Sequence, residues 1–332
     1  MRFFPPAVLL ASLSLAASLP ALMAADVPAA PAAPVPPAAT GIDESKIKHM
    51  IDESKIKRMP WHLGDMWWDI GEAATKEEFQ SLELDFDVKG KVADGVNLYI
   101  APTGGSGGVE GQDFYGGIQT NTGMCRTRAE PAENQRRFIG RAAIFSTWKD
   151  RDLASIQTSE NGYFDSSGHE GDFISVRHKL QWGEGRYTYR ICRLRTEYVD
   201  GKPRAWVGAF VLDHQSGEET QVGSLRLQKG EHLHLTRRLS AFVEIYGGKK
   251  PLAQLPFGLE VTFFVPRING KVVPEPHAAE QFDPGLPDLM TISPVNAKGE
   301  ALAKPKPAEV AGMRFKLGTE PVRREKRFQW LF

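Results

Sequence analysis

Cysteine is scarce in this chain: Cys125 and Cys192 are the two among 332 residues. Two cysteines do not make a thiolate metal motif, and no cofactor is predicted. Two arrangements remain open, one disulfide between Cys125 and Cys192 or two separate buried thiols. The sequence does not give the separation of the two Cα atoms, which decides between them.

An excess of charge of either sign is also absent, since Lys+Arg and Asp+Glu both number 41. A formal net charge of zero gives no reason to expect nucleic acid or an anionic membrane surface as a partner. The glycine-rich segment 101–111 lacks the lysine of a phosphate loop. After the first residues there is no long apolar run, so no integral membrane span is expected in the mature chain.

The first residues, "MRFFPPAVLLASLSLAASLPALMAAD", combine an early arginine, an apolar run and a series of small residues. This order predicts a secretory signal peptide over residues 1–25, with an uncleaved membrane anchor as the alternative. We therefore expect a secreted protein, periplasmic or extracellular, in which a disulfide could form.

The segment after the leader has a different composition. Residues 26–41 are rich in proline and alanine and predict an extended linker. "IDESKIKHM" and "IDESKIKRM" then repeat in tandem, and their glutamates and lysines predict a short charged helix over residues 42–60. Pro60 ends that helix.

Short segments rich in valine, isoleucine and aromatic residues alternate with glycine, aspartate and asparagine over residues 61–270. "FQSLELDFDV" (79–88), for example, alternates apolar and polar residues, as a half-buried strand does. No long apolar stripe of helical period appears. We predict an all-β fold, an antiparallel β-sandwich of the jelly-roll or lectin-like type, with an extended C-terminal tail over 271–332 that adds edge strands. Eight further strands are expected at 95–101, 113–120, 137–148, 186–195, 204–214, 220–227, 240–247 and 258–265.

Acidic residues gather around "DSSGHEGD" (165–172). If the protein is an enzyme, Glu170 is the first candidate acid, Asp172 and Glu184 are the next, and His169 is an alternative base. The same oxygen-rich loop could hold a structural calcium ion, with an ordinary polar turn as the alternative.

Aromatic and arginine side chains follow in "RYTYRICRLR" (186–195), where Tyr187 shares one face with Tyr189 and Ile191. Aromatic rings stack on the CH-rich faces of sugars, and arginines pair with carboxylates or sulfates. The predicted ligand-binding residues are Trp148, Trp182, Tyr187, Arg186 and Arg190. The competing interpretation is ordinary core packing for the rings and a solvated sheet face for the arginines. A change of phase near Ile191 and Cys192 predicts a β-bulge.

Five segments occur in a characteristic order along the chain. They are "FYGGIQTN" (114–121), "AIFSTWKD" (143–150), "HEGDF" (169–173), "LQWGEGRYTYRICR" (180–193) and "WVGAFVLD" (206–213). In this order they resemble a family of secreted, mostly bacterial proteins catalogued as a domain of unknown function. The resemblance covers about residues 61–227 and implies an extracytoplasmic β-sandwich. It implies no catalytic residues.

Three functions are consistent with these observations. The favoured hypothesis is a non-catalytic protein that binds polysaccharide or a cell-surface glycan. The second is a glycoside hydrolase or polysaccharide lyase on the same sandwich. The third is an envelope structural or interaction protein, which would use the charged helix and the tail for contact.

Overall fold

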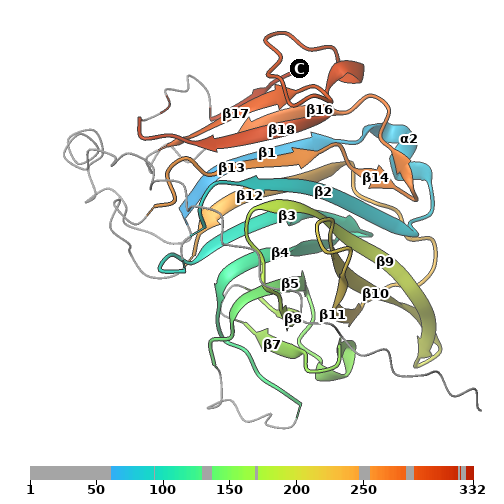
Figure 1. The fold of residues 1–332 in the computed structure, drawn as a ribbon. Coiled ribbons are helices and arrows are strands. Elements are labelled where there is room, and N and C mark those ends of the chain that lie inside the picture. The colour runs from blue at the N-terminus through green and yellow to red at the C-terminus, as the bar shows by residue number, and fades with distance from the viewer. Residues whose placement is uncertain are drawn as a thin grey trace, which may run out of the picture. The chain divides into compact units, whose positions relative to one another are not determined.

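The computed structural model describes residues 61–92, 94–128, 137–168, 171–246, 255–281, 288–320, 322 and 327–332. The predicted leader, linker and charged helix, residues 1–60, lie outside this range. Nearly all regular structure in the described part is β-strand (Figure 1). Its helical segments are too short to cross a membrane. They are α2 (Gly71–Lys76), η3 (Leu153–Ser155) and η5 (Pro307–Glu309).

Sheet 1 has nine strands in the spatial order β19-β16-β1-β12-β3-β4-β5-β8-β7, and its strand pairs are antiparallel. Its central strands β12, β3, β4, β5 and β8 carry the pocket described below. The strands are β1 (Trp61–Asp69), β3 (Leu98–Val109), β4 (Gln112–Thr122), β5 (Gly140–Trp148), β7 (Tyr163–Ser167), β8 (Phe173–Lys179), β12 (Arg238–Ile245), β16 (His277–Gln281) and β19 (Phe328–Trp330).

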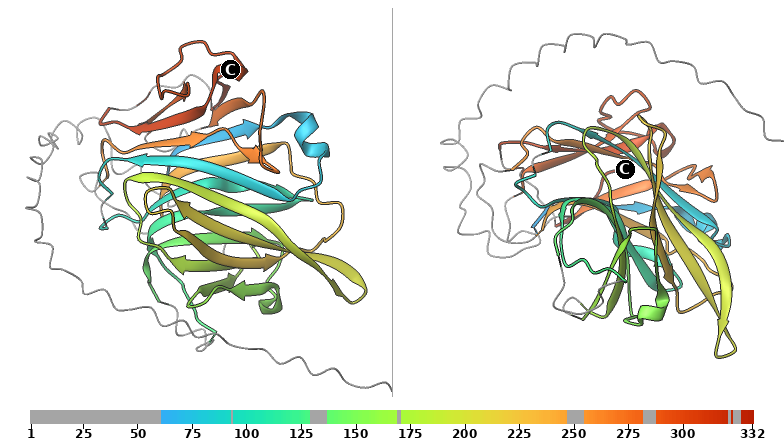
Figure 2. Two further views of the ribbon diagram at one scale, coloured as in Figure 1. Left: turned by 45° about the vertical axis from the view of Figure 1, so that its right-hand side comes forward. Right: turned by 60° about the horizontal axis from the view of Figure 1, so that its bottom comes forward.

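Sheet 2 has ten strands, eight of them in the order β17-β18-β13-β2-β9-β10-β11-β6, with the short pair β14 and β15 joined to β2. Its long β9–β10 hairpin extends beyond the body of the two sheets (Figure 2). The strands are β2 (Ser81–Lys89), β6 (Ile156–Thr158), β9 (Gly185–Val199), β10 (Lys202–Asp213), β11 (Glu219–Arg226), β13 (Glu260–Phe264), β14 (Arg267–Ile268), β15 (Lys271–Val272), β17 (Met290–Val295) and β18 (Gly312–Leu317).

The main hydrophobic core lies between the two sheets. Strand β2 contributes Leu82, Leu84, Phe86 and Val88, which are all buried, as their spacing of two predicts. Alternate residues of sheet 1 meet this layer from the other side, including Ile118, Phe145 and Val176. The two packed antiparallel sheets confirm the predicted all-β sandwich.

All nine strands predicted from the sequence are present, and a turn at Asp200–Gly201 joins β9 to β10. Both turn residues have positive φ, at 50° and 72°, as a two-residue hairpin of type I′ requires. The bulge lies later than predicted. Pairing of β9 with β2 is regular through Cys192, and the register shift against β10 falls between Arg193 and Arg195.

The C-terminal segment is more than a tail with edge strands. Strand β18 lies between β17 and β13 in sheet 2, and β16 lies between β19 and β1 in sheet 1. Met313 and Phe315 of β18 are buried in the main core. Residues 271–332 therefore supply internal strands to both sheets, in addition to edge strands.

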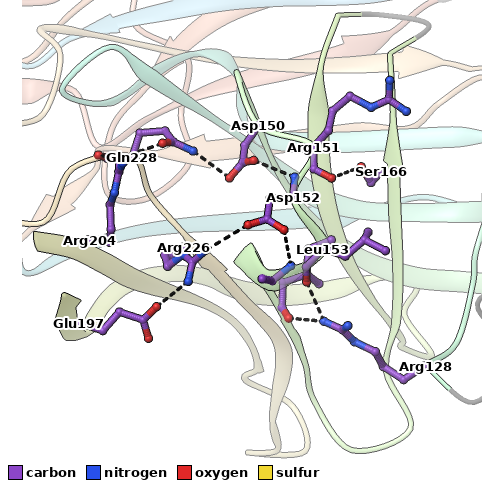
Figure 3. Close-up of polar contacts among 12 residues, drawn as sticks. Arg128, Asp150, Arg151, Asp152, Leu153, Ser166, Glu197, Arg204, Arg226 and Gln228 are labelled. Carbon is purple, nitrogen blue, oxygen red and sulfur yellow. Dashed lines mark hydrogen bonds and ion pairs between the residues drawn. The ribbon is translucent and has the colours of Figure 1, made fainter. Parts of the chain in front are cut away.

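A polar network ties the loop after β5 of sheet 1 to sheet 2 (Figure 3). The Arg226 guanidinium lies 3.2 Å from Asp152 Oδ2 and 2.6 Å from Glu197 Oε1. Asp152 also caps η3 by accepting a hydrogen bond from the Ala154 N–H at 2.9 Å. Gln228 Nε2 donates to Asp150 Oδ2 at 2.9 Å. These contacts fix the end of β5, which carries Trp148.

Replacing Arg226 with methionine should lower the free energy of unfolding by about 1 kcal/mol, because two partly exposed ion pairs are lost while the stem still packs. Urea denaturation measures this. Arg151→Met is the control, since Arg151 is 55% exposed and its Nε lies 3.9 Å from Asp172 Oδ1. Equal losses in the two variants would contradict a special role for Arg226.

Candidate binding pocket on sheet 1

A second, smaller hydrophobic cluster lies on the face of sheet 1 that points away from the main core. The strand period of two sends alternate side chains of β3, β4, β5 and β12 to this face. The cluster consists of Tyr99, Ala101, Ile144 and Phe242, with Tyr115 packed against them.

Aromatic rings form a continuous row across this face. The ring centroids of Tyr99 and Tyr115 are 5.3 Å apart, and those of Tyr115 and Trp148 are also 5.3 Å apart in an edge-on arrangement. Trp148 and Phe173 follow with a centroid distance of 6.4 Å. The row crosses β3, β4, β5 and β8, and edge-to-face and tilted contacts of this kind keep the rings in place. It gives the face a rigid apolar floor.

This floor belongs to a pocket with a volume of about 200 Å³. A cavity of about 150 Å³ accommodates benzene, so this volume suits a molecule with one six-membered ring. Large apolar side chains dominate the lining, with a few polar groups among them, as is usual for small-molecule sites. The lining residues are Asn97, Tyr99, Tyr115, Gln119, Gly123, Met124, Phe138, Ile144, Ser146, Trp148, Asp165, Phe173, Arg177, Glu244 and Tyr246.

One end of the pocket is acidic. Glu244 is fully buried, and its Oε1 accepts a hydrogen bond from the Tyr115 hydroxyl at 3.0 Å. Its Oε2 lies 3.1 Å from His62 Nε2, while His62 Nδ1 lies 3.6 Å from Asp65 Oδ2. One imidazole therefore stands between two carboxylates. We call Glu244, Asp65 and His62 the acidic end.

Ionisation at the acidic end departs from ordinary values. Burial opposes a charge on His62, but hydrogen bonds to Asp65 and Glu244 outweigh it and raise the pKa of His62 to about 10. Burial raises the pKa of Asp65, partly offset by the hydrogen bond from His62. His62 is thus a cation at neutral pH.

The raised pKa of His62 predicts a pH dependence of stability. The folded state holds the proton more tightly than the unfolded chain, whose histidine pKa is near 6.5, so this contribution is complete below that pH and is lost as pH rises through 10. The free energy of unfolding should fall between pH 7 and pH 10, and less steeply in His62→Gln. Urea denaturation across this range measures the slope. His178→Gln is the control, because the His178 ring contacts the main-chain oxygens of Lys179 and Glu160. An unchanged slope in His62→Gln would contradict the assignment.

The opposite end of the pocket is basic. Asp165, fully buried, lies 3.1 Å from the Arg126 guanidinium and 3.5 Å from that of Arg177. Arg177 Nε also donates to Ser175 Oγ at 3.3 Å, and the Ser146 hydroxyl donates to Ser175 Oγ at 2.9 Å. We call Arg126, Arg177 and Asp165 the basic end.

Two polar groups of the lining have unused hydrogen-bonding capacity. The Tyr99 hydroxyl and Asn97 Oδ1 are buried and have no hydrogen-bond partner among the described residues. Buried polar atoms normally have a partner, so both atoms are available to a ligand.

The structure separates the predicted ligand-binding residues. Trp148 lines the pocket. Trp182 is 4% exposed and its Nε1 donates to the Gln119 carbonyl at 3.1 Å, while Tyr187 is 3% exposed and stacks on Phe86 with centroids 5.5 Å apart. Both are therefore core-packing residues here: the phase of β9 points Tyr187 between the sheets, and Trp182, in the segment between β8 and β9, is buried in the same core.

The two predicted arginines are on sheet 2, away from Trp148. Arg186 pairs with Asp85 at 3.0 Å and covers the Phe264 ring, and Arg190 pairs with Glu219 at 2.6 Å. They do not form one surface with the sheet 1 pocket.

The structure describes only two of the four predicted catalytic residues. Glu170 and His169 lie outside the described residues. Asp172 is exposed, and Glu184 accepts a hydrogen bond from the Gly90 main chain. In the described ranges, no group of three or more histidine, cysteine or acidic side chains is arranged to hold a metal ion, calcium included.

The disulfide alternative is not realised. Cys125 and Cys192 are both free thiols. Cys125 is buried beside Arg177 near sheet 1, whereas Cys192 is in β9 of sheet 2 opposite Gly208 and Ser81. Burial raises the pKa of both thiols.

No protein-family model and no curated protein matches this chain. The resemblance drawn from the order of the sequence motifs therefore stays a prediction, and the pocket itself is the basis for function.

Sequence reasoning missed Tyr99, Tyr115, Glu244, His62 and Arg177. One signal was present in "AFVEIY" (241–246): an acid stands inside an otherwise apolar strand, in phase with Phe242 and Tyr246. A glutamate at such a position must have polar partners, which is a reason to expect a site.

Proposed function

We propose that this protein binds a carbohydrate without cleaving it, and that one sugar ring occupies the sheet 1 pocket. The observation that carries the proposal is the aromatic row of Tyr99, Tyr115, Trp148 and Phe173 beside buried charged groups. A sugar ring offers CH-rich faces to such a floor and hydroxyl groups to the walls. The free Tyr99 hydroxyl and Asn97 Oδ1 would exchange hydrogen bonds with those hydroxyls.

A location outside the cytoplasm, periplasmic or extracellular, belongs to the same proposal. It is supported by the leader-like residues 1–25 and the proline-rich residues 26–41. Polysaccharides and surface glycans are the carbohydrates available there.

Trp148 provides the direct test. Affinity electrophoresis in gels containing plant, algal or bacterial polysaccharides should show retardation of the protein, and Trp148→Ala should weaken it at least about tenfold, as expected for loss of a buried aromatic anchor. Tyr198→Ala is the control, because Tyr198 is 69% exposed on the β9–β10 hairpin. Absence of retardation by every glycan would refute the proposal, and so would equal weakening by both variants.

A second candidate is carbohydrate cleavage at the acidic end. Asp65, whose pKa is raised by burial, and Glu244, which accepts a hydrogen bond from the Tyr115 hydroxyl, would be the two acids. Two acids with different environments are the usual requirement for glycoside hydrolysis.

Assays for new reducing ends and for unsaturated products test this candidate. Product that disappears in Glu244→Gln, while glycan binding remains, would establish cleavage. Binding without product would leave the non-catalytic function. Glu244, rather than Glu170, is therefore the first candidate acid to test by substitution.

A further inference from the structure

The two ends of the pocket differ in their charged groups: anionic groups outnumber cationic ones at the acidic end, and the reverse holds at the basic end. At the acidic end His62 stands between two carboxylates, whereas at the basic end two arginines share Asp165. In the described part of the chain neither arginine forms another ion pair with a carboxylate. The basic end therefore has one formal positive charge more than it has negative charge.

This excess charge is buried. Arg126 is 5% exposed and Arg177 is 8% exposed. Arg126 Nε has no acceptor among the described residues. Buried charges normally require a compensating partner, and an arginine fork suits carboxylate, sulfate and phosphate oxygens.

Arg177 also lies at the correct place for a ligand on the aromatic floor. Phe173, Ser175 and Arg177 alternate along β8 on the pocket face, and Phe173 is the register partner of Trp148. Four residues of strand span about 13 Å, which leaves room for one sugar ring between the Trp148 end and the Arg177 guanidinium. Ser146 lines the space between them.

We propose that the ligand is an acidic sugar, with its carboxylate or sulfate against Arg177 and its uncharged hydroxyls toward Glu244. This inference rests on the proposed carbohydrate binding and specifies the ligand class of the same pocket. A neutral sugar would leave the excess positive charge uncompensated, and a sugar bound in the reverse direction would bring its anion to Glu244.

Matched pairs of ligands test the proposal. Isothermal titration calorimetry would compare oligogalacturonate with its methyl ester, and an oligosaccharide of sulfated galactan with its desulfated form. We expect one acidic member to bind at least about tenfold more tightly than its neutral partner, and the pair that shows this identifies carboxylate or sulfate as the anion. Raising the salt concentration should reduce the difference.

Variants assign the preference to the basic end. Arg177→Gln should abolish the difference between acidic and neutral ligand, and Arg177→Lys, which keeps the charge but loses the fork, should retain part of it. Arg190→Gln on sheet 2 should leave it unchanged. Circular dichroism checks that each variant is folded, and Arg177→Lys remains informative if Arg177→Gln is not.

The outcomes separate the two proposals. If neutral glycans bind through Trp148 and both acidic ligands bind no better than their neutral forms, the acidic-sugar inference fails and carbohydrate binding stands. A preference that persists in Arg177→Gln also overturns the inference. If no glycan of any kind binds, both proposals fail.

Discussion

Asp165→Asn should lower the free energy of unfolding by about 3–5 kcal/mol, the largest loss expected from one polar substitution at this site. Asp165 is fully buried and is the carboxylate shared by Arg126 and Arg177. An amide leaves both guanidinium groups buried without a counter-charge. Guanidinium chloride or urea denaturation, followed by tryptophan fluorescence, measures the loss.

Asp150→Asn is the matched control for this substitution. Asp150 is 8% exposed, and its oxygens accept from the Asp152 N–H at 2.8 Å and from Gln228 Nε2 at 2.9 Å. Because these partners are uncharged, the expected loss is about 1 kcal/mol. Losses of equal size would show that the two arginines do not depend on Asp165.

Gly117→Ala should be one of the most disruptive small substitutions in sheet 1, with a loss of at least about 3 kcal/mol. An added Cβ would lie 2.0 Å from the Ile100 carbonyl oxygen and 2.9 Å from the Ala101 Cα. Strand β3 approaches so closely because its pairing with β4 is irregular between Ile100 and Thr103. Main-chain atoms cannot move aside as a flexible side chain does, so β3 and β4 must separate.

Thermal unfolding of Gly117→Ala and of the control Gly95→Ala measures this effect. No atom of the described residues lies within 4 Å of a Cβ added at Gly95, so its replacement should leave stability nearly unchanged. A stable, well-folded Gly117→Ala would show that β3 can shift at little cost. Failure of both variants to fold would point to chain flexibility rather than to the contact with β3.

The fold could be predicted from the sequence because strand periodicity is local. The pattern of Leu82, Leu84, Phe86 and Val88 needs no knowledge of distant residues, and glycine-containing turns mark the strand ends. Strand β1 was missed because it follows the charged repeat directly, and β8 because its polar residues resemble a loop. Their places in sheet 1 depend on pairing with β12 and β5, which are distant in sequence.

The pocket could not be predicted because its residues come from six strands. Trp148 was identified only because it is aromatic. Trp182 and Tyr187 are aromatic too, but they are packed in the core. Deciding between these outcomes requires the phase of each strand relative to two sheets. The meeting of Glu244 with Tyr115 depends on β12, β3 and β4 being neighbours, which the sequence pattern does not specify.

The aromatic row and the main core occupy opposite faces of sheet 1. Side chains such as Trp148 and Phe173 can therefore be exchanged without opening a void between the sheets. Selectivity in this scaffold is free to diverge through outward-facing aromatic positions such as Tyr115, Trp148 and Phe173 while the inward-facing positions preserve folding. A library randomised at those three positions would be expected to retain cooperative melting in most members, which makes the protein a practical starting point for engineered recognition.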